Sequence, residues 1–375
     1  MSAQFNYVAT CLFGLEKLVG EEIDELGYSR RETIDGRVYF SGLPDAVARC
    51  NINFRTAERL FIELASFNAE SFTQLFDNVA KIPWELIIGK DDAFPVKGHS
   101  IKSKLHSIPD CQSIIKKAVV KRLSEKYNVE WFEETGITYQ IEFFILNDKV
   151  SIMLDTSGNA LHKRGYRPAS GAAPLRETLA AALVKLSRPR ENVRLWDPFC
   201  GSGTIAIEAA MIMTNTAPGL NRKFAAEKYA FLPKKIWEEA RIEAKANVRE
   251  TEFYAFASDI DDEVLSVAKQ NIRRSGMEKY IRVFKKDATT IEKDDVRTTI
   301  VCNPPYGERL ENVRAARELY KKMGKCFSYL DPWQIYVITS EEEFEKLYGR
   351  RADKVRKLYN GMIKCNYYQF FKKKD

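Results

Sequence analysis

The sequence has few of the residues that build structural metal sites. Its three histidines (His99, His106 and His162) form no H-E-x-x-H pattern, and its seven cysteines include no C-x-x-C pair. An odd number of cysteines without paired spacing also argues against a disulfide framework. We therefore expect no structural metal, and reduced, mostly buried thiols in a cytoplasmic protein.

Long apolar runs are absent as well. A bilayer-spanning helix needs roughly 18–20 apolar residues, but the best candidate, Leu179–Leu186, is interrupted by Lys185. The N-terminus has no basic stretch before an apolar core, and Glu16 interrupts it early. No secretory signal is visible, and we expect no membrane partner.

The composition is that of a folded protein, and its charge is unevenly distributed along the chain. The 375 residues are 45% hydrophobic and 30% charged, which suggests two or three domains. The net charge of +7 divides into +6 over Pro95–Lys126, +7 over Gly349–Asp375 and −6 elsewhere. Two basic segments on an otherwise acidic chain fit a polyanionic partner, although solvated helix faces explain them equally well on charge alone.

The first 65 residues predict a small unit of alternating elements. They are a strand over Phe5–Cys11, a helix closed by Gly27, a strand over Arg37–Ser41, a short helix over Pro44–Asn51 and a strand over Arg59–Phe67. This β-α-β-α-β order is compatible with a ferredoxin-like fold.

A more basic segment follows. Its predicted elements are a helix over Ser71–Val79, a strand over Pro95–Ser103, a helix from Asp110 as N-cap to Tyr127, and a hairpin of Ile137–Leu146 and Lys149–Asp155. In the second helix an apolar stripe runs from Ile114 to Leu123, which places Lys116, Lys117, Lys121 and Arg122 on the other face. The polar stretch 157–174 reads as a hinge.

From Leu175 onward, strands and helices alternate, which predicts a mostly parallel sheet covered on both faces. The strands are expected at Val193–Trp196, Phe253–Ser258, Ile281–Phe284, Thr298–Cys302 and Gln334–Thr339, and the helices at Leu175–Leu186, Thr204–Met213, Asp262–Arg274 and Asn312–Tyr329. A helical insertion from Thr214 to about Arg249 is expected to be a surface excursion. The chain ends in a predicted antiparallel hairpin around Asn360-Gly361.

The first candidate binding motif is Asp197-Pro198-Phe199-Cys200-Gly201-Ser202-Gly203-Thr204, between an apolar strand and an apolar helix. Glycines let a ligand approach the backbone closely, and the helix N-terminus offers free N–H groups. Because G-S-G lacks the third glycine of dinucleotide-binding loops, an NAD-type oxidoreductase is disfavoured.

Acidic residues follow the next two strands. Asp259 or Asp261 can accept hydrogen bonds from ribose hydroxyls, although either can instead cap the helix near Asp262. Asp287-Ala288 offers an acceptor for an adenine amino group, and the alternative is a structural loop acid.

The most specific motif is Asn303-Pro304-Pro305-Tyr306-Gly307 after a buried strand. The prolines fix the backbone, so that the Asn303 side-chain oxygen and the Pro304 carbonyl can both accept from one exocyclic amino group. Such acceptors orient the nitrogen lone pair toward an electrophile, and Tyr306 offers a ring for base stacking. A turn with a packed tyrosine is the alternative.

Together with Leu161-His162-Lys163-Arg164-Gly165-Tyr166-Arg167 and the segment Ala173–Ala182, these motifs resemble the THUMP-domain RNA methyltransferases. The whole chain is similar to the large-subunit rRNA guanine-N2 methyltransferase (RlmL-type) family. The resemblance implies a Rossmann-like class I methyltransferase domain over 159–375, after a ferredoxin-like domain over 1–65 and an overlapping THUMP domain over 46–158.

The resemblance also implies S-adenosylmethionine (SAM) as cofactor and RNA as partner, without a metal. The implied cofactor-binding residues are Pro174, Leu175, Asp197, Gly201, Gly203, Asp259, Asp287, Ala288 and Asn303, and the implied catalytic residues are Asn303, Pro304 and Tyr306. The expected RNA contacts are Lys97, Lys102, Lys104, Lys116, Lys117, Lys121, Arg122 and Arg164.

The expected reaction is methylation of guanine N2 in RNA, most simply large-subunit rRNA, after the base has been flipped into the pocket. No general base is needed, because the amine can lose its proton after methyl transfer. Adenine-N6 methylation and tRNA guanine-N2 methylation are the enzymatic alternatives. An RNA-binding or ribosome-assembly protein with an inactive methyltransferase domain is the non-enzymatic one.

Overall fold

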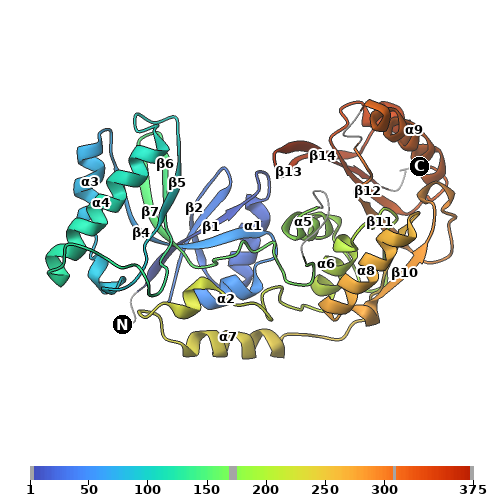
Figure 1. Ribbon diagram of the computed structural model, residues 1–375. Helices are drawn as coiled ribbons and strands as arrows, with labels where there is room; N and C mark the ends of the chain where they lie inside the picture. The colour runs from blue at the N-terminus through green and yellow to red at the C-terminus, as the bar shows by residue number, and fades with distance from the viewer. Residues whose placement is uncertain (1–3, 169–174, 307–309, 372–375) are drawn as a thin grey trace. The chain divides into compact units, whose positions relative to one another are not determined.

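The computed structural model describes residues 4–168, 175–306 and 310–371. The chain forms two compact units (Figure 1). The first contains residues 1–10, 20–161 and 222–243, and the second contains residues 11–19, 162–221 and 244–375. Within the described ranges, no helix combines the length and apolarity needed to cross a bilayer.

The first unit is built on a seven-stranded sheet with the order β2-β3-β1-β4-β7-β6-β5. The strands are β1 (Phe5–Cys11), β2 (Ser29–Ile34), β3 (Arg37–Gly42), β4 (Ala57–Asn68), β5 (Val96–Ile101), β6 (Ile141–Leu146) and β7 (Lys149–Asp155). β4 pairs antiparallel with β7, and β5 runs parallel to β6. The long strand β4 therefore joins the β-α-β-α-β half to the basic half in one sheet.

The helices of this region are close to those predicted. They are α1 (Glu16–Glu25), which spans the division between the units, α2 (Ala46–Asn53), α3 (Phe72–Ala80) and α4 (Ile108–Tyr127), with a 3₁₀ turn η1 (Trp84–Leu86). The predicted N-cap of α4 is wrong: the helix begins after Ser107, and Asp110 lies in its first turn. An acid there still favours the positive end of the helix dipole.

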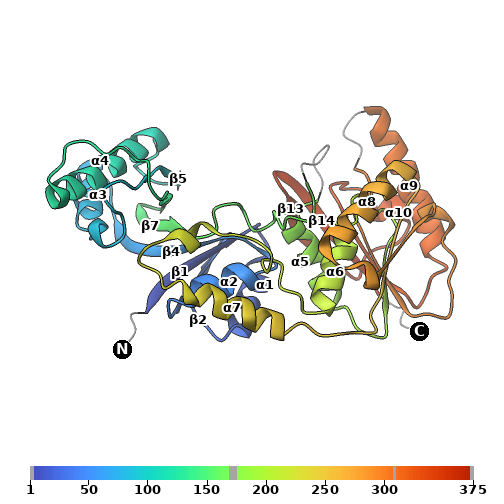
Figure 2. The same cartoon turned by 60° about the horizontal axis from the view of Figure 1, so that its bottom comes forward.

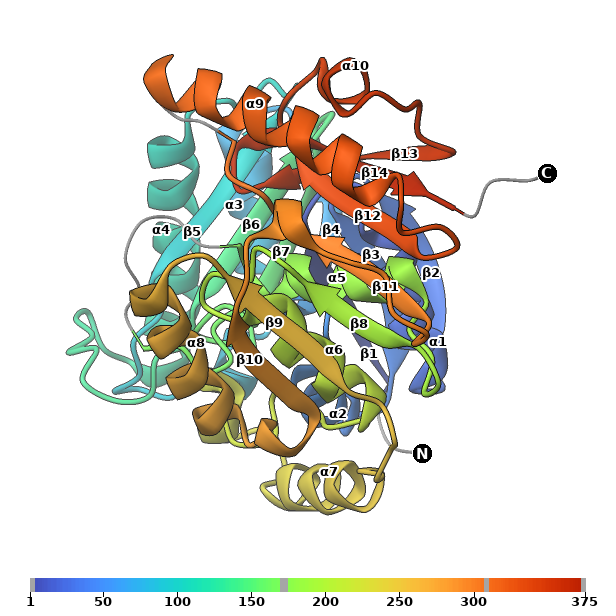
Figure 3. The same cartoon turned by 90° about the vertical axis from the view of Figure 1, so that its right-hand side faces the viewer.

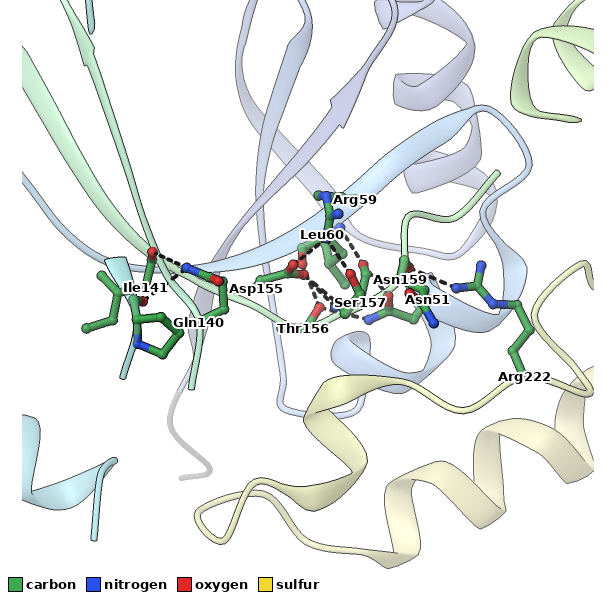
Figure 4. Close-up of polar contacts among 12 residues, drawn as sticks. Asn51, Arg59, Leu60, Gln140, Ile141, Asp155, Thr156, Ser157, Asn159 and Arg222 are labelled. Carbon is green, nitrogen blue, oxygen red and sulfur yellow. Dashed lines mark hydrogen bonds and ion pairs between the residues drawn. The ribbon is translucent and has the colours of Figure 1, made fainter. Parts of the chain in front are cut away.

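Polar contacts fix the chain where it leaves β7 (Figure 4). The Ser157 hydroxyl donates to Asn51 Oδ1 at 2.7 Å, and Asn51 Nδ2 donates to the Thr156 hydroxyl at 2.9 Å. The backbone N–H of Leu60 donates to Ser157 Oγ at 2.9 Å, and Arg59 forms an ion pair with Asp155. The start of the predicted hinge is thus tied to α2 and β4.

The insertion after Thr214 is not the surface excursion that we expected. Residues 222–243 belong to the first unit and include most of α7 (Lys235–Ala246), which lies alongside α2 (Figures 1 and 2). Arg49 on α2 holds Glu243 with two hydrogen bonds of 2.7 and 2.8 Å. The ring of Tyr229 stacks on Tyr139 with centroids 4.5 Å apart. Burial of the two tyrosine rings, together with the Arg49–Glu243 pair, explains why this segment packs in the first unit.

The second unit contains the predicted parallel sheet, in the order β10-β9-β8-β11-β12-β14-β13 (Figure 3). Its strands are β8 (Arg194–Asp197), β9 (Ala255–Asp259), β10 (Ile281–Lys285), β11 (Thr298–Cys302), β12 (Gln334–Thr339), β13 (Lys354–Asn360) and β14 (Ile363–Phe370). The first five are parallel, and β14 pairs antiparallel with both β12 and β13. The predicted parallel sheet with a terminal antiparallel hairpin is confirmed.

Helices cover both faces of this sheet. Successive side chains of a strand point to opposite faces, and here they are apolar on both. The second-unit helices are α5 (Glu177–Ser187), α6 (Thr204–Met213), α8 (Asp262–Ser275), α9 (Leu310–Phe327) and a short α10 (Phe344–Tyr348), with 3₁₀ turns η2 (Ala225–Lys228, in the first unit), η3 (Glu278–Tyr280) and η4 (Ala288–Thr290). Leu195 and Val301 pack in one core with residues of α5, α6 and α8, whereas Trp196 and Ile300 pack in the other with residues of α9 and α10.

Candidate active site

A cavity of ≈ 600 Å³ lies in the second unit, where β8 and β11 end. Asp197 closes β8, Asn303 follows β11 directly, and both line the cavity. Ligands of parallel α/β sheets bind at this edge, because the carboxyl ends of the strands and the helix N-termini meet there. Leu175 and Gly201 also line the cavity. Pro174, predicted beside Leu175, lies outside the described residues.

The glycine loop has the backbone geometry that its sequence predicts. Gly201 and Gly203 have φ angles of +50° and +82°, which non-glycine residues rarely adopt. A Cβ atom at position 201 would meet nothing within 4 Å, so this face of the loop is open. Gly203 is the N-cap of α6 and provides no side-chain cap, which leaves the first N–H groups of the helix available to a ligand.

Asp197 is a buried acid beside this loop. Burial raises the pKa of its carboxyl to about 8, the Phe199 N–H opposes this rise with a 3.1 Å hydrogen bond, and the Asp259 carboxylate adds to it. Near neutral pH this raised pKa favours the protonated form of the Asp197 carboxyl.

The two acids after β9 have different roles. Asp259 accepts hydrogen bonds from the Gly201 N–H at 3.1 Å and the Ile260 N–H at 2.8 Å, so it supports the glycine loop. Asp261 caps α8 by accepting from Glu263 N–H at 2.8 Å. Asp287 caps η4 through Thr289, and Ala288 is buried; neither lines the cavity.

The segment after β11 is held from several sides. Pro304 is buried, and the Tyr320 hydroxyl donates to the Pro305 carbonyl at 2.8 Å. Tyr306 is half-buried, and its hydroxyl donates to Asn303 Oδ1 at 2.5 Å. The sulfur of Cys365 on β14 lies 3.8 Å from the same hydroxyl. The terminal hairpin thus contacts the predicted catalytic tyrosine.

Sequence reasoning missed Arg167 as a cavity residue. Its Nη1 donates to the Leu175 carbonyl at 3.1 Å and to the Thr204 hydroxyl at 3.3 Å, and its Nη2 lies 3.0 Å from Glu177 Oε2. The side chain is only 10% exposed yet lines the cavity beside the start of α6. The L-H-K-R-G-Y-R motif contained this residue, but no local pattern indicated that it faces a ligand.

Arg164, from the same motif, does not fit its predicted contact with RNA. Its side chain is buried, its Nε lies 3.4 Å from the buried carboxylate of Glu208, and Tyr166 donates to that carboxylate at 3.1 Å. A buried arginine paired with a buried acid supports the fold and is not available to a phosphate.

The other predicted RNA contacts form two groups. Lys116 and Arg122 on α4 form ion pairs with Glu134 and Glu85, and Lys104 forms one with Glu70. Lys97, Lys102, Lys117 and Lys121 are exposed and form no ion pair with any residue in the described ranges. Only the second group presents cations without a competing carboxylate.

Three known protein families together match nearly the whole chain. The family described as "RMKL-like, methyltransferase domain" matches residues 164–369. The chain belongs to this methyltransferase family. The families described as "RlmL ferredoxin-like domain" and "THUMP domain" match residues 6–61 and 69–155 of this RMKL-like methyltransferase, so the predicted domain types are confirmed.

Two curated relatives differ in length. YpsC of Bacillus subtilis (strain 168), named as a proposed RNA methyltransferase, is 46% identical over 379 residues, covering 99% of this RMKL-like methyltransferase and 97% of YpsC. The ribosomal RNA large subunit methyltransferase K/L of Shewanella pealeana is 33% identical over 369 residues. This match covers 96% of our chain but 52% of the Shewanella protein, so the chain spans about half the length of that relative.

Solved structures share the complete architecture. A protein from Clostridium difficile 630, described as a possible methylase, has a TM-score of 0.96 at 44% identity and covers 100% of this chain and 99% of its own. A Listeria monocytogenes protein, named as a predicted N6-adenine-specific DNA methylase, has a TM-score of 0.92 at 43% identity, covering 99% and 97%. SMU.472, named as a proposed methyltransferase and crystallised with SAH, has a TM-score of 0.91 at 37% identity, covering both chains fully.

Within residues 4–168, 175–306 and 310–371, no three His, Cys, Asp or Glu residues are grouped so as to hold a metal ion. The cavity offers glycine backbone, a buried acid, an arginine and an amide. These groups can bind a zwitterionic cofactor and position an amino group beside it.

Proposed function

We propose that the protein transfers the methyl group of SAM to the exocyclic N2 amino group of a guanine in RNA, with large-subunit rRNA as substrate. The observation that carries the proposal is the position of Asn303, whose amide lines the same cavity as the glycine loop. A substrate amino group held by Asn303 would therefore lie beside the methyl donor.

The residues of the cavity fit a donor that carries both a carboxylate and an ammonium group. Arg167 and the uncapped N-terminus of α6 would hold the carboxylate, and Asp197 would ionise to hold the ammonium. Asp259, Asp287 with Ala288, and Pro174 with Leu175 are proposed for the ribose, the adenine and the closing wall. When bound, SAM supplies an electrophilic methyl group on a sulfonium. The SAH bound by SMU.472, a neighbour at 37% identity, supports this assignment.

For the transfer step, Asn303 Oδ1 and the Pro304 carbonyl accept the two hydrogens of the amino group and aim its lone pair at the methyl carbon. With SAM bound, the substrate nitrogen would form its bond to the methyl carbon as the carbon–sulfur bond breaks, which would leave a neutral thioether. The methylated amine would then release its proton to water. Tyr306 would stack on the base after releasing Asn303. No residue has to remove the proton before transfer.

RNA as substrate is supported by the THUMP match and by relatives named for RNA or ribosomal RNA methylation. The exposed lysines of β5, the turn after it and α4 (Lys97, Lys102, Lys117 and Lys121) would hold its backbone. Guanine N2 rests on the resemblance to the RlmL-type family. An rRNA substrate would place the protein in the cytoplasm.

Adenine N6 is a second candidate, because the Asn303-Pro304 acceptors suit either amino group and the Listeria neighbour is named for that chemistry. Transfer of labelled methyl from SAM to rRNA and tRNA of a deletion strain, followed by nucleoside analysis, decides between them. We expect labelled N2-methylguanosine in large-subunit rRNA. Labelled N6-methyladenosine would contradict the guanine assignment, and label confined to tRNA would contradict the rRNA assignment.

The same experiment separates an enzyme from an inactive assembly protein. Asn303→Ala should abolish transfer while a calorimetric titration still shows SAM binding, because the Asn303 oxygen is proposed to hold the substrate amino group and the other implied donor contacts remain. Absence of transfer by the wild-type protein to either RNA, with intact SAM binding, would contradict the proposed activity.

A further inference from the structure

The hairpin of β13 and β14 ends in an exposed methionine. Asn360 pairs with Ile363, which leaves Gly361 and Met362 as a two-residue loop. Gly361 has a φ of +63°, as a type II′ turn requires at its first loop position. Met362 therefore occupies the outermost position of the hairpin, and 97% of its surface is exposed.

This hairpin also contacts the proposed target-base site. The sulfur of Cys365 on β14 lies 3.8 Å from the Tyr306 hydroxyl. Tyr306 in turn holds Asn303. At roughly 3.4 Å per residue, the three residues from Cys365 to Met362 span about 10 Å. Met362 therefore lies about 10 Å along the chain from Cys365, which contacts the tyrosine of the proposed base site.

The surroundings of the tip are those of a nucleic-acid contact. Lys357 and Lys364 are exposed on the same hairpin, and Lys364 Nζ lies 3.6 Å from Glu342 Oε1, so of these two Lys357 is the cation without a carboxylate partner among the described residues. Lys357 Nζ lies 5.6 Å from the centre of the Tyr359 ring, and that ring meets the exposed ring of Phe13 edge-on at 5.8 Å. Ile363 beside Met362 is also partly exposed, so the tip is apolar. An apolar tip near a cation and aromatic rings fits RNA, in which a negative backbone flanks apolar base faces.

We propose that Met362 is a wedge that enters the RNA base stack when the target nucleotide flips into the active site. This inference rests on the proposed function. A flipped base leaves a gap in the stack and loses its stacking and pairing energy. Apolar side chains inserted between bases occupy such gaps, and the unbranched, flexible side chain of methionine adapts to an irregular one.

The test uses two synthetic, unmethylated RNAs that contain the target nucleotide. In one RNA this nucleotide is base-paired in a hairpin, and in the other it lies in an unpaired strand. Met362→Ala should lower kcat/KM about tenfold on the paired RNA, a modest share of the unstacking cost. It should leave kcat/KM on the unpaired RNA within about twofold, because no base has to leave a stack. Met362→Leu should restore the activity on paired RNA.

The matched control is Ile242→Ala, which truncates another exposed apolar side chain, on α7, and should change neither value. A 2-aminopurine at the target position reports flipping directly: its fluorescence should rise on binding of the wild-type protein and rise less with Met362→Ala. Equal losses on both RNAs, or no loss on either, would overturn the wedge. Failure of the proposed function is distinct, because the wild-type protein would then methylate neither RNA.

Discussion

The Tyr306 hydroxyl donates a 2.5 Å hydrogen bond to the side-chain oxygen of Asn303. That oxygen is the acceptor proposed for the substrate amino group, so the tyrosine occupies it before a base enters. Burial raises the pKa of the Tyr306 hydroxyl, which keeps the phenol protonated and able to donate. An incoming base therefore competes with the Tyr306 hydroxyl for this oxygen.

Tyr306→Phe and Tyr306→Ala should have opposite effects on methyl transfer. The phenylalanine keeps the ring and removes the competing donor, so KM for RNA should fall by up to about fivefold, the equivalent of one net hydrogen bond of ~1 kcal/mol. The alanine loses base stacking worth roughly 1–3 kcal/mol, so kcat/KM should fall at least about tenfold. Steady-state kinetics measures both. If Tyr306→Phe is as damaging as Tyr306→Ala, the hydroxyl takes part in catalysis directly.

The buried carboxyl of Asp197 predicts pH-dependent donor binding. Its pKa is raised to about 8, whereas an aspartate in the unfolded chain titrates near 3.9. Because the donor's ammonium requires the ionised carboxyl, affinity should rise as pH increases toward about 8. Above this pH it should fall, since an α-amino group loses its proton near 7.7–8.0. Calorimetry should detect proton release on the acid limb, and that limb should disappear in Asp197→Asn.

Rising pH should have the opposite effect on folding stability to the one it has on SAM affinity. Because the folded pKa is the higher one, the contribution of this carboxyl to folding is complete below about pH 4 and is lost as pH rises through about 8. In denaturant unfolding, the free energy of unfolding of Asp197→Asn relative to wild type should therefore increase as pH rises across this window. A difference independent of pH would mean that Asp197 is ionised in the folded protein.

Variants of Arg167 and Glu177 should distinguish a role in donor binding from a role in folding stability. Arg167→Met removes the proposed carboxylate ligand and leaves Glu177 buried without its partner, and breaking a buried pair in this way typically costs about 3–5 kcal/mol. The double variant Arg167→Met/Glu177→Gln should recover much of this stability, because no uncompensated charge remains. The Kd for SAM should stay raised at least about tenfold in both variants. Recovery of SAM affinity in the double variant would show that Arg167 acts only on the fold.

The local patterns that predicted the fold well were those with strong periodicity. Strands β11 and β12 and helix α6 begin and end at the predicted residues, because apolar runs bounded by polar turns define them. β2 was not predicted, since Ser29 to Thr33 are all exposed at a sheet edge and show no apolar alternation. The place of residues 222–243 in the first unit depends on long-range contacts such as Arg49 with Glu243, which no local pattern reveals.

The site was predictable where chemistry lies on consecutive residues. Asp197 ends β8, Gly201 lies in the loop after it, and Asn303 directly follows β11, so the sheet brings them to one cavity. Arg167 comes from a separate motif, and only the folded chain places it at the start of α6. The helical pattern of α4 placed its lysines and Arg122 on one outer face, but it could not show that Glu134 and Glu85, outside the helix, pair with Lys116 and Arg122.

This difference among the α4 cations gives a last prediction. Lys117→Ala and Lys121→Ala should each weaken RNA binding and reduce the slope of log K against log salt by about 1, because each removes one phosphate contact. Lys116→Ala should change the slope little, since its ammonium is held by Glu134 and lies 3.6 Å from the centre of the Phe94 ring. Filter binding of rRNA fragments at several salt concentrations measures the slope. A slope reduced equally by Lys116→Ala and Lys117→Ala would show that RNA displaces Glu134, and that the ion pair does not decide which lysines bind.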